Sequence, residues 1–397
     1  MPDEKPAIDG GTPVRTTLLP YGHQVVGQAE IDAVTAVLRS DWLTTGPLVD
    51  RFERAVAEAA GATAAVAVSN GTAALHAAAF AAGISPGDEV IVPALTFAAS
   101  ANCILYQGGT PVFADVRRDT LNVDPESVRE KLTGKTRAIV TVDYAGQPSD
   151  LDELHAIAAE RNLTVIEDAS HALGATYKGR PVGSLAPLTT FSFHPVKLIT
   201  TGEGGMIATT SPDLAEAMRV FRSHGITTDA RQRESVGAFH YEMEHLGYNY
   251  RLTDLQCALG LEQLRRYGDF LERRNELARR YDAALAGVAE VERPTLLPDR
   301  TSAWHLYVIR LNLDMLWESR KRVFEALRAE NIGVNVHYMP VPWHPYYARR
   351  GYTRGGWPVA EVEYERMLTL PLWPGMSDAD ADSVVAAVRK IVAAYRR

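Results

Sequence analysis

Short apolar runs alternate with helix-like segments between residues 60 and 210, and this alternation is the main signal in the chain. The runs are AAVAVSN, DEVIVPAL, TPVFADV, RAIVTVDYA, LTVIEDAS, TTFSFH and GGMIATT. Each is almost continuously apolar, which indicates strands buried on both faces of a mostly parallel sheet. Such a sheet is completed by helices that cover its two faces. The pattern therefore predicts a large α/β domain.

A different pattern begins near residue 250. Residues 253–288 show long helical periodicity with interspersed Glu and Arg, which predicts a connecting helix. After it, WHLYVIRL and GVNVHYMP are typical of strands, and DADADSVVAAVRKIVAAYRR of a closing helix. With 397 residues the chain exceeds the size at which one core usually stops growing. We predict a large domain over residues 1–255, which includes an N-terminal arm, and a small C-terminal α/β domain over residues 256–397.

Composition narrows the class of protein. The net charge of −8 is spread along the chain, which argues against nucleic acid as a partner. The two cysteines, Cys103 and Cys257, lack the spacing of a metal site, so we expect no metal and a reducing cytoplasm. No apolar run approaches the roughly 20 residues that cross a bilayer, and the N-terminus lacks a signal-peptide core. We expect a soluble cytoplasmic protein without membrane contact.

The first strand end with candidate chemistry lies in VAVSNGTAALHAAAF. A strand runs into Ser69, Asn70, Gly71 and Thr72, and an alanine-rich helix follows at once. Free N–H groups and the positive end of the helix dipole favour an anion there, and Gly71 allows a phosphate to approach closely. An ordinary capped helix is the alternative.

The second strand end with candidate chemistry lies in LTVIEDASHALGATY. Glu167 and Asp168 follow a buried run, where a carboxylate costs several kcal/mol unless a cation or a donor meets it. A protonated ring nitrogen is one such partner. The alternatives are a helix cap for Asp168 and a packed, hydrogen-bonded ring for His171.

The third strand end with candidate chemistry lies in TTFSFHPVKLITTGEGGMIATT. Ser192 and Lys197 flank a turn made by His194 and Pro195, and the glycine-rich TGEGG follows. Desolvation in a confined place disfavours an ammonium group, which leaves a nucleophilic amine able to condense with an aldehyde. On spacing alone, Lys197 could equally be a surface charge.

These three strand ends together are more specific than each one alone. The carboxyl ends of parallel strands meet at one edge of a sheet, where ligands of α/β proteins bind. An anion cradle, a carboxylate and an amine are what pyridoxal 5′-phosphate (PLP) requires for its phosphate, its ring nitrogen and its aldehyde. The sequence therefore predicts a PLP site.

Ordered motifs over nearly the whole chain resemble the DegT/StrS family of sugar-nucleotide aminotransferases, which have the fold-type I PLP architecture. They run from LTTGP through SNGTAAL, TFAASANCI, VDYAGQP, EDASHALGA, SFHPVK, TGEGG, FRSHG and GYNYRLTDLQCALGLEQL to VHYMP. SFHPVKLITTGEGG, VDYAG, DASHALG and VFRSHGI look most like the C4 aminotransferases of the pseudaminic-acid pathway. That resemblance implies transfer of an amino group, from glutamate, to the 4-keto group of a UDP-linked 4-keto-6-deoxy-2-acetamido hexose.

The resemblance also implies roles for single residues. Lys197 matches the lysine that bonds to PLP and is free when the cofactor is in its pyridoxamine (PMP) form, and Asp168 matches the partner of the pyridine nitrogen. His171 falls near the ring hydroxyl. The other matching positions are phosphate ligands at Gly71, Thr72 and Ser192, a stacking aromatic at Phe97, and Asn249, which reaches the phosphate of the neighbouring subunit. The resemblance therefore implies a homodimer with shared sites.

Substrate contacts are the least defined part of the prediction. Candidates for the sugar or its diphosphate are Thr45, His337 and Tyr338, and candidates for a phosphate or the donor carboxylate are Arg222 and His224. A structural role is the alternative for each. Other functions also stay open, namely an aminotransferase acting at C3 of a dTDP-sugar or on an inosose, a catalytically silent PLP-binding regulator, and a non-catalytic nucleotide-binding protein.

Overall fold

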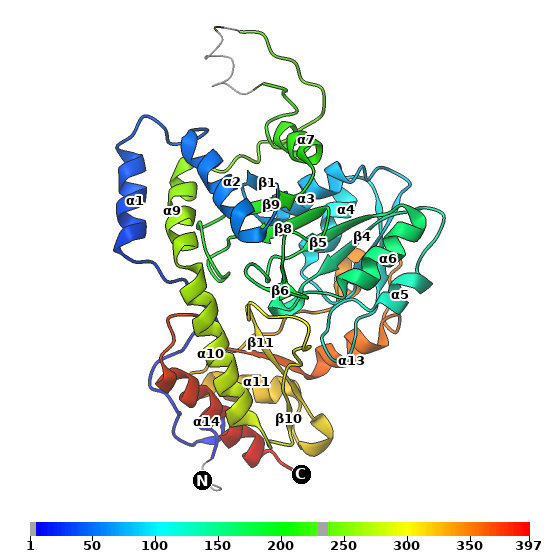
Figure 1. Ribbon diagram of the computed structural model, residues 1–397. Helices are drawn as coiled ribbons and strands as arrows, with labels where there is room; N and C mark the ends of the chain where they lie inside the picture. Colours follow the sequence, from blue (N-terminus) through cyan, green and yellow to red (C-terminus); the bar gives the residue numbers. More distant parts are fainter. Residues whose placement is uncertain (1–4, 229–236, 238) are drawn as a thin grey trace.

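A seven-stranded sheet forms the centre of the larger part of the molecule, as the computed structural model of residues 5–228, 237 and 239–397 shows (Figure 1). The strand order is β1-β9-β8-β5-β4-β2-β3. The strands are β1 (Ala64–Val68), β2 (Glu89–Pro93), β3 (Thr110–Ala114), β4 (Thr136–Val142), β5 (Thr164–Asp168), β8 (Leu188–Ser192) and β9 (Gly205–Thr209). The pairs made by β9 are antiparallel and the other pairs are parallel. The predicted mostly parallel α/β sheet is confirmed.

Helices cover both faces of this sheet. Val66 and Val68 of β1 belong to a core with α3 (Gly71–Ala81), α4 (Ala98–Tyr106) and α7 (Pro212–Arg222). Ala65 and Ala67 of the same strand face the opposite core, which α2 (Pro47–Ala60) and α9 (Asp254–Arg265) supply. Because both faces are buried, the strands need no polar positions, which explains their continuous apolar runs. The remaining helices of this part are α1 (Gln28–Leu38), α5 (Pro125–Glu130), η2 (Tyr144–Gly146) and α6 (Leu151–Arg161), and a small hairpin joins β6 (Thr176–Tyr177) to β7 (Arg180–Pro181).

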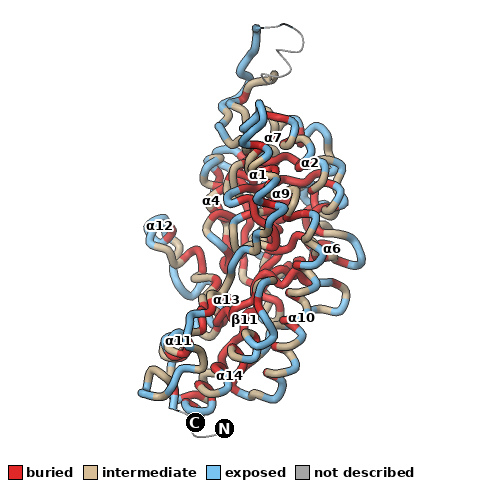
Figure 2. The backbone as a smooth tube through the Cα atoms, turned by 90° about the vertical axis from the view of Figure 1, so that its left-hand side faces the viewer, coloured by how far each residue is buried: buried red, intermediate tan, exposed pale blue. Residues whose placement is uncertain are grey.

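The smaller part has a core of its own around an antiparallel sheet. The sheet consists of β10 (Val291–Glu292), β11 (Tyr307–Leu311) and β12 (Met367–Leu370). Its helices are α10 (Tyr267–Leu285), η3 (Leu313–Met315), α11 (Arg320–Ala329), η4 (Val341–Trp343), α12 (Pro345–Ala348), α13 (Pro358–Arg366) and α14 (Asp378–Ala394). The C-terminus and the first described residues of the chain lie here (Figure 1), and buried residues fill the interior of both parts (Figure 2).

The N-terminal segment packs on the smaller part. The backbone N–H groups of Ala7 and Val14 donate to the buried carboxylate of Glu330, and Leu19 pairs with Ile332. A short 3-10 helix, η1 (Ala7–Asp9), lies in this segment. The predicted connecting helix is present as two helices, α9 and α10, which meet at Arg266. The division into domains at residues 255 and 256 stays a prediction.

The predicted strand at GVNVHYMP is wrong. Only Asn335 forms a bridge there, through mutual backbone hydrogen bonds with Thr369. β10 and β12 are the strands that pair with β11, and Pro340 has no N–H to continue a ladder. Residues 335–338 instead turn toward the cavity described below.

No helix in residues 5–228, 237 and 239–397 combines the length and the apolar composition needed to span a bilayer.

Candidate active site

A cavity of about 810 Å³ lies where the carboxyl ends of the central strands face the smaller part. The larger part contributes the residues after β1, β5 and β8, and the smaller part contributes His305 and residues 335–338. Its size falls in the range of about 300–1000 Å³ that is typical of ligand sites. The three predicted strand ends therefore meet in one place.

The predicted anion cradle is built at the start of α3. Asn70 caps this helix, because its side-chain oxygen accepts from the N–H of Ala73 at 2.8 Å. A Cβ on Gly71 would lie 2.9 Å from Cβ of Ser192, so the lack of a side chain at position 71 lets α3 pack against the end of β8. Gly71, Thr72 and Ser192 all line the cavity. N–H groups of a first helical turn have no partner within the helix, so this arrangement suits a phosphate.

Asp168 is the last residue of β5 and is only 5% exposed. Its Oδ2 accepts a hydrogen bond of 2.6 Å from Ser100, and its Oδ1 one of 2.6 Å from the hydroxyl of Ser170. Two short bonds of this kind fix the orientation of a carboxylate. Ser100 was not among the predicted site residues, and nothing near it in the sequence marks it.

Lys197 lies in the irregular segment after β8, with its amine in the same cavity. Burial lowers the pKa of this amine to about 8; Asp168 opposes the shift and Arg274 adds to it. About a tenth of the amine is therefore unprotonated at pH 7, far more than for an ordinary lysine, and this free amine is the form that a nucleophile or base requires. The Lys197 Nζ lies 3.3 Å from Nε2 of His305, a residue that the sequence analysis did not select.

His171, which the sequence predicts as a site residue, also lies at the cavity. His171 is 7% exposed, and burial, Lys197 and His337 hold the pKa of its ring well below the usual value. Its Nε2 lies 3.2 Å from the hydroxyl of Tyr338, while its buried Nδ1 has no partner within the described part of the chain. A neutral imidazole with one unused nitrogen is thus available to a polar group of a ligand.

Two aromatic side chains and a histidine complete the cavity wall. Phe97, the residue before α4, is 58% exposed, and its ring centroid lies 5.8 Å from that of Tyr338. His337 is held by Thr369, whose hydroxyl is 2.8 Å from its Nδ1. Phe97, His337 and Tyr338 therefore face the space where a flat ring and a substrate would lie.

Four predicted residues do not line the cavity of this chain. Arg222 is bonded to the carboxylate of Glu53 and to the carbonyl of Ala67, so its guanidinium already has internal partners. His224 and Asn249 are exposed, and Thr45 is half-buried. The roles predicted for these four residues in binding stay predictions.

The arrangement fits PLP. The start of α3 with Thr72 and Ser192 would hold its phosphate, Asp168 its ring nitrogen, and Lys197 its aldehyde. The glycine at position 71 leaves the cradle open, because a Cβ there would meet Ser192.

The comparisons with known proteins agree with this fit. The sequence profile of the DegT/DnrJ/EryC1/StrS aminotransferase family matches residues 24–389. The spore coat polysaccharide biosynthesis protein SpsC of Bacillus subtilis is 45% identical over 381 residues, which cover 95% of this chain and 98% of SpsC.

Two solved structures are similar over almost the whole chain. The candidate sugar aminotransferase Spr1654 of Streptococcus pneumoniae, in its PMP form, has a TM-score of 0.89 and 34% identity, and the match covers 94% of this chain and 99% of that one. Helicobacter pylori PseC, an aminotransferase involved in the biosynthesis of pseudoaminic acid, has a TM-score of 0.89 and 30% identity, and covers 96% of this chain and 100% of its own.

Proposed function

This chain belongs to the DegT/DnrJ/EryC1/StrS aminotransferase family of PLP-dependent sugar aminotransferases, and we propose that its acceptor is the 4-keto group of a nucleotide-linked sugar. The sugar proposed is a UDP-linked 4-keto-6-deoxy-N-acetyl hexosamine, and the amino donor proposed is L-glutamate. The similarity to PseC and the SFHPVK motif carry this choice. A cavity of about 810 Å³ leaves room for a sugar beside a cofactor.

The chemistry is divided between the cofactor and the residues around it. When bound, PLP supplies an aldehyde that condenses with amines and a ring that accepts an electron pair. Asp168 would hold the ring nitrogen in its protonated form, since its carboxylate is kept in one orientation by Ser100 and Ser170. Without that proton the ring would be a weaker electron acceptor.

Lys197 is the acid and base of both halves of the reaction. Its Nζ would take the proton from the α-carbon of the amino donor and deliver it to the cofactor, and in the second half it would take a proton back from the cofactor and deliver it to C4 of the sugar. A pKa of about 8 suits both directions, because neither the amine nor the ammonium is strongly favoured near neutral pH. Phe97 and Tyr338 line the cavity beside Lys197 and would present apolar ring surface to the cofactor and the substrate.

We further propose a cytoplasmic homodimer with shared sites. Asn249 is exposed and does not line the cavity of its own chain, which leaves it free to reach the phosphate cradle of a partner. The residues before it expose large apolar side chains, with Phe239 93% and Leu246 80% exposed. Apolar exposure of this extent is typical of a surface covered by another chain. Two free, buried cysteines suit a reducing compartment.

A panel of acceptors tests the choice of substrate. Purified protein receives L-glutamate with the UDP-linked 4-keto sugar, a dTDP-linked 3-keto sugar or an inosose, and mass spectrometry measures each amino product. We expect the 4-keto UDP-sugar to be the best substrate by at least about tenfold in kcat/KM, a difference of about 1.4 kcal/mol. Preference for either of the other two acceptors refutes the assignment. The amount of amino product formed by Lys197→Ala gives the background of the assay.

A further inference from the structure

His305 comes from the smaller part of the molecule and reaches the amine of Lys197 in the larger part. The two residues are 108 positions apart, and the Nε2 to Nζ distance is 3.3 Å. The ring of His305 also lies against His171, with 4.3 Å between the centroids. His305 itself is 7% exposed, so its contacts with the protein are the main ones it makes.

The backbone on both sides of His305 is attached to the turn that follows β4. The N–H of Ala303 donates to the carbonyl of Gly146 at 2.9 Å, and the N–H of Leu306 donates to that of Ala145 at 3.2 Å. A Cβ on Gly146 would lie 3.1 Å from the backbone nitrogen of His305. The two segments can therefore approach this closely only because residue 146 is a glycine. The contact fixes the backbone from which the His305 side chain extends.

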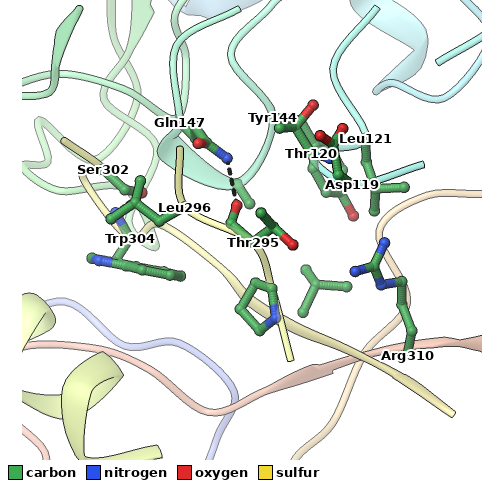
Figure 3. Close-up of a pocket in the computed structure, with 13 residues that line it drawn as sticks. Asp119, Thr120, Leu121, Tyr144, Gln147, Thr295, Leu296, Ser302, Trp304 and Arg310 are labelled. Carbon is green, nitrogen blue, oxygen red and sulfur yellow. Dashed lines mark hydrogen bonds between the residues drawn. The ribbon is translucent and has the colours of Figure 1, made fainter. Parts of the chain in front are cut away.

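Two unusual backbone conformations occur at this contact. Ala145 has φ of 59° and Trp304 has φ of 45°, in the left-handed region that non-glycine residues rarely adopt. Trp304 borders a small cavity beside the contact, where Gln147 donates to the carbonyl of Thr295 at 2.8 Å (Figure 3). Such conformations persist where surrounding structure requires them, which indicates that the place of the next residue, His305, is under strong constraint.

The buried side chain of Arg274 also supports the backbone at His305. The Nη1 of Arg274 donates to the carbonyls of Trp304, at 3.0 Å, and His305, at 3.3 Å. Arg274 is itself fully buried, so this contact lies inside the protein. The position of the His305 ring is therefore set by its backbone rather than by adaptable side-chain contacts.

The ring of His305 is held in its neutral form. The titratable groups that act on it are Lys197, His171, Arg274 and His337, all of them basic, and with burial they keep the pKa of the ring well below the usual value. A neutral imidazole carries one N–H, either on Nδ1 or on Nε2. Nδ1 is buried and has no partner in the described part of the chain. Because a buried N–H without an acceptor is rarer than a bare acceptor, the proton belongs on Nε2, which faces Lys197.

We propose that His305 is a positioning residue for Lys197: its ring, protonated at Nε2, donates a hydrogen bond to the lysine Nζ and holds the free amine unprotonated, ready for the cofactor. The Nζ of Lys197 can accept this hydrogen bond only while the amine is unprotonated and is not bonded to the cofactor. Asp168 favours the ammonium form, so His305 acts against that carboxylate. This inference rests on the role of Lys197 in the proposed function but not on the identity of the sugar.

Chemical labelling of the cofactor-free protein tests this inference. Lysines are acetylated briefly with acetic anhydride between pH 6 and 11, and mass spectrometry of the Lys197 peptide gives the fraction labelled. We compare His305→Phe, which fills the space without a donor, with His305→Gln, whose amide can donate. His155→Phe, at another buried-ring position on α6, is the matched control.

Wild-type protein should label half-maximally near pH 8, the pKa of this amine. In His305→Phe the midpoint should rise by about 0.5–1 pH unit, which makes labelling at pH 7 about three- to tenfold slower. His305→Gln and His155→Phe should keep the wild-type midpoint. A midpoint in His305→Phe that is unchanged or lower refutes the proposal.

Nitrogen-15 NMR of wild-type apoprotein gives an answer even if His305→Phe does not fold. At about pH 9.5, above the pKa of the Lys197 amine, the shifts of the His305 ring should report a protonated Nε2 and a bare Nδ1, and a proton on Nδ1 at that pH refutes the proposal. Both measurements use protein without cofactor or sugar, so failure of the acceptor panel leaves their outcome unaffected.

Discussion

The hydroxyl group of Ser100 lies 2.6 Å from Oδ2 of Asp168, and both side chains are buried. Since Ser100 donates its one proton to the carboxylate, its oxygen accepts from Thr96, 2.8 Å away. This chain of bonds links α4 to the end of β5. It holds the carboxylate in place for a ring nitrogen before any cofactor binds.

Replacing Ser100 with Ala should weaken PLP binding. The substitution removes a hydrogen bond to a charged group, which is worth about 1.5–3 kcal/mol, and lets the carboxylate of Asp168 rotate. We expect the dissociation constant of PLP to rise at least about tenfold, measured by fluorescence titration of apoprotein. Ser383→Ala, on the surface of α14, is the control. Equal affinity in Ser100→Ala and wild type would show that this bond does not orient Asp168.

Gly71→Ala should lower affinity for the phosphate of the cofactor specifically. The added Cβ would lie 2.9 Å from Cβ of Ser192, inside the cradle that the start of α3 forms. We expect PLP to bind at least about tenfold more weakly, while pyridoxal, which has no phosphate, binds as before. Gly268→Ala is the matched control, because a Cβ there meets nothing within 4 Å. An equal loss for both ligands would place the phosphate elsewhere.

Lys197→Met should stabilise the apoprotein at neutral pH. The pKa of the amine is lowered from 10.5 to about 8, so the unfolded chain binds more protons between these values, and the folded state carries the full cost of the ammonium below pH 8. Methionine removes that cost, which solvent reduces to about 1–2 kcal/mol in a half-buried side chain.

Urea unfolding between pH 7 and pH 10.5 measures this effect. The advantage of Lys197→Met should be largest at pH 7 and should shrink as pH rises from 8 to 10.5. Lys321→Met, an exposed position on α11, should show no such trend. A constant difference between Lys197→Met and wild type across this range would argue against a desolvated amine.

The proposed shared site predicts complementation between inactive chains. Lys197→Ala and Asn249→Ala should each be nearly inactive, because each lacks one component of every site. In a mixed dimer, one of the two sites contains both wild-type residues, so subunit exchange should restore up to about a quarter of the wild-type activity if chains pair at random. Absence of rescue in a sample shown to contain mixed dimers would mean that Asn249 does not serve a partner.

Whether a site residue could be predicted from the sequence depends on where it lies in the fold. Gly71, Asp168 and Lys197 lie at or after the ends of strands of one sheet, and since strand ends meet at an edge, their convergence was predictable. His305 reaches the site across 108 residues from another part of the molecule, and it directly precedes a strand whose apolar pattern draws attention instead. Its place depends on the packing of two lobes, which no local pattern encodes.

The wrongly predicted strand at GVNVHYMP has a similar cause. The segment alternates as a strand does, but within it only Asn335 forms a bridge, to Thr369 of β12. Residues 335–338 line the cavity instead, and because tertiary packing sets that placement, propensity alone cannot decide it.

Borohydride trapping tests the central claim most directly, namely that Lys197 is the amine that bonds to PLP and is released by an amino donor. Protein loaded with PLP is reduced, digested and analysed by mass spectrometry. We predict that the pyridoxyl group is found on the Lys197 peptide, and that incubation with L-glutamate before reduction removes it. A group attached to another lysine, or one that glutamate does not remove, would contradict the account.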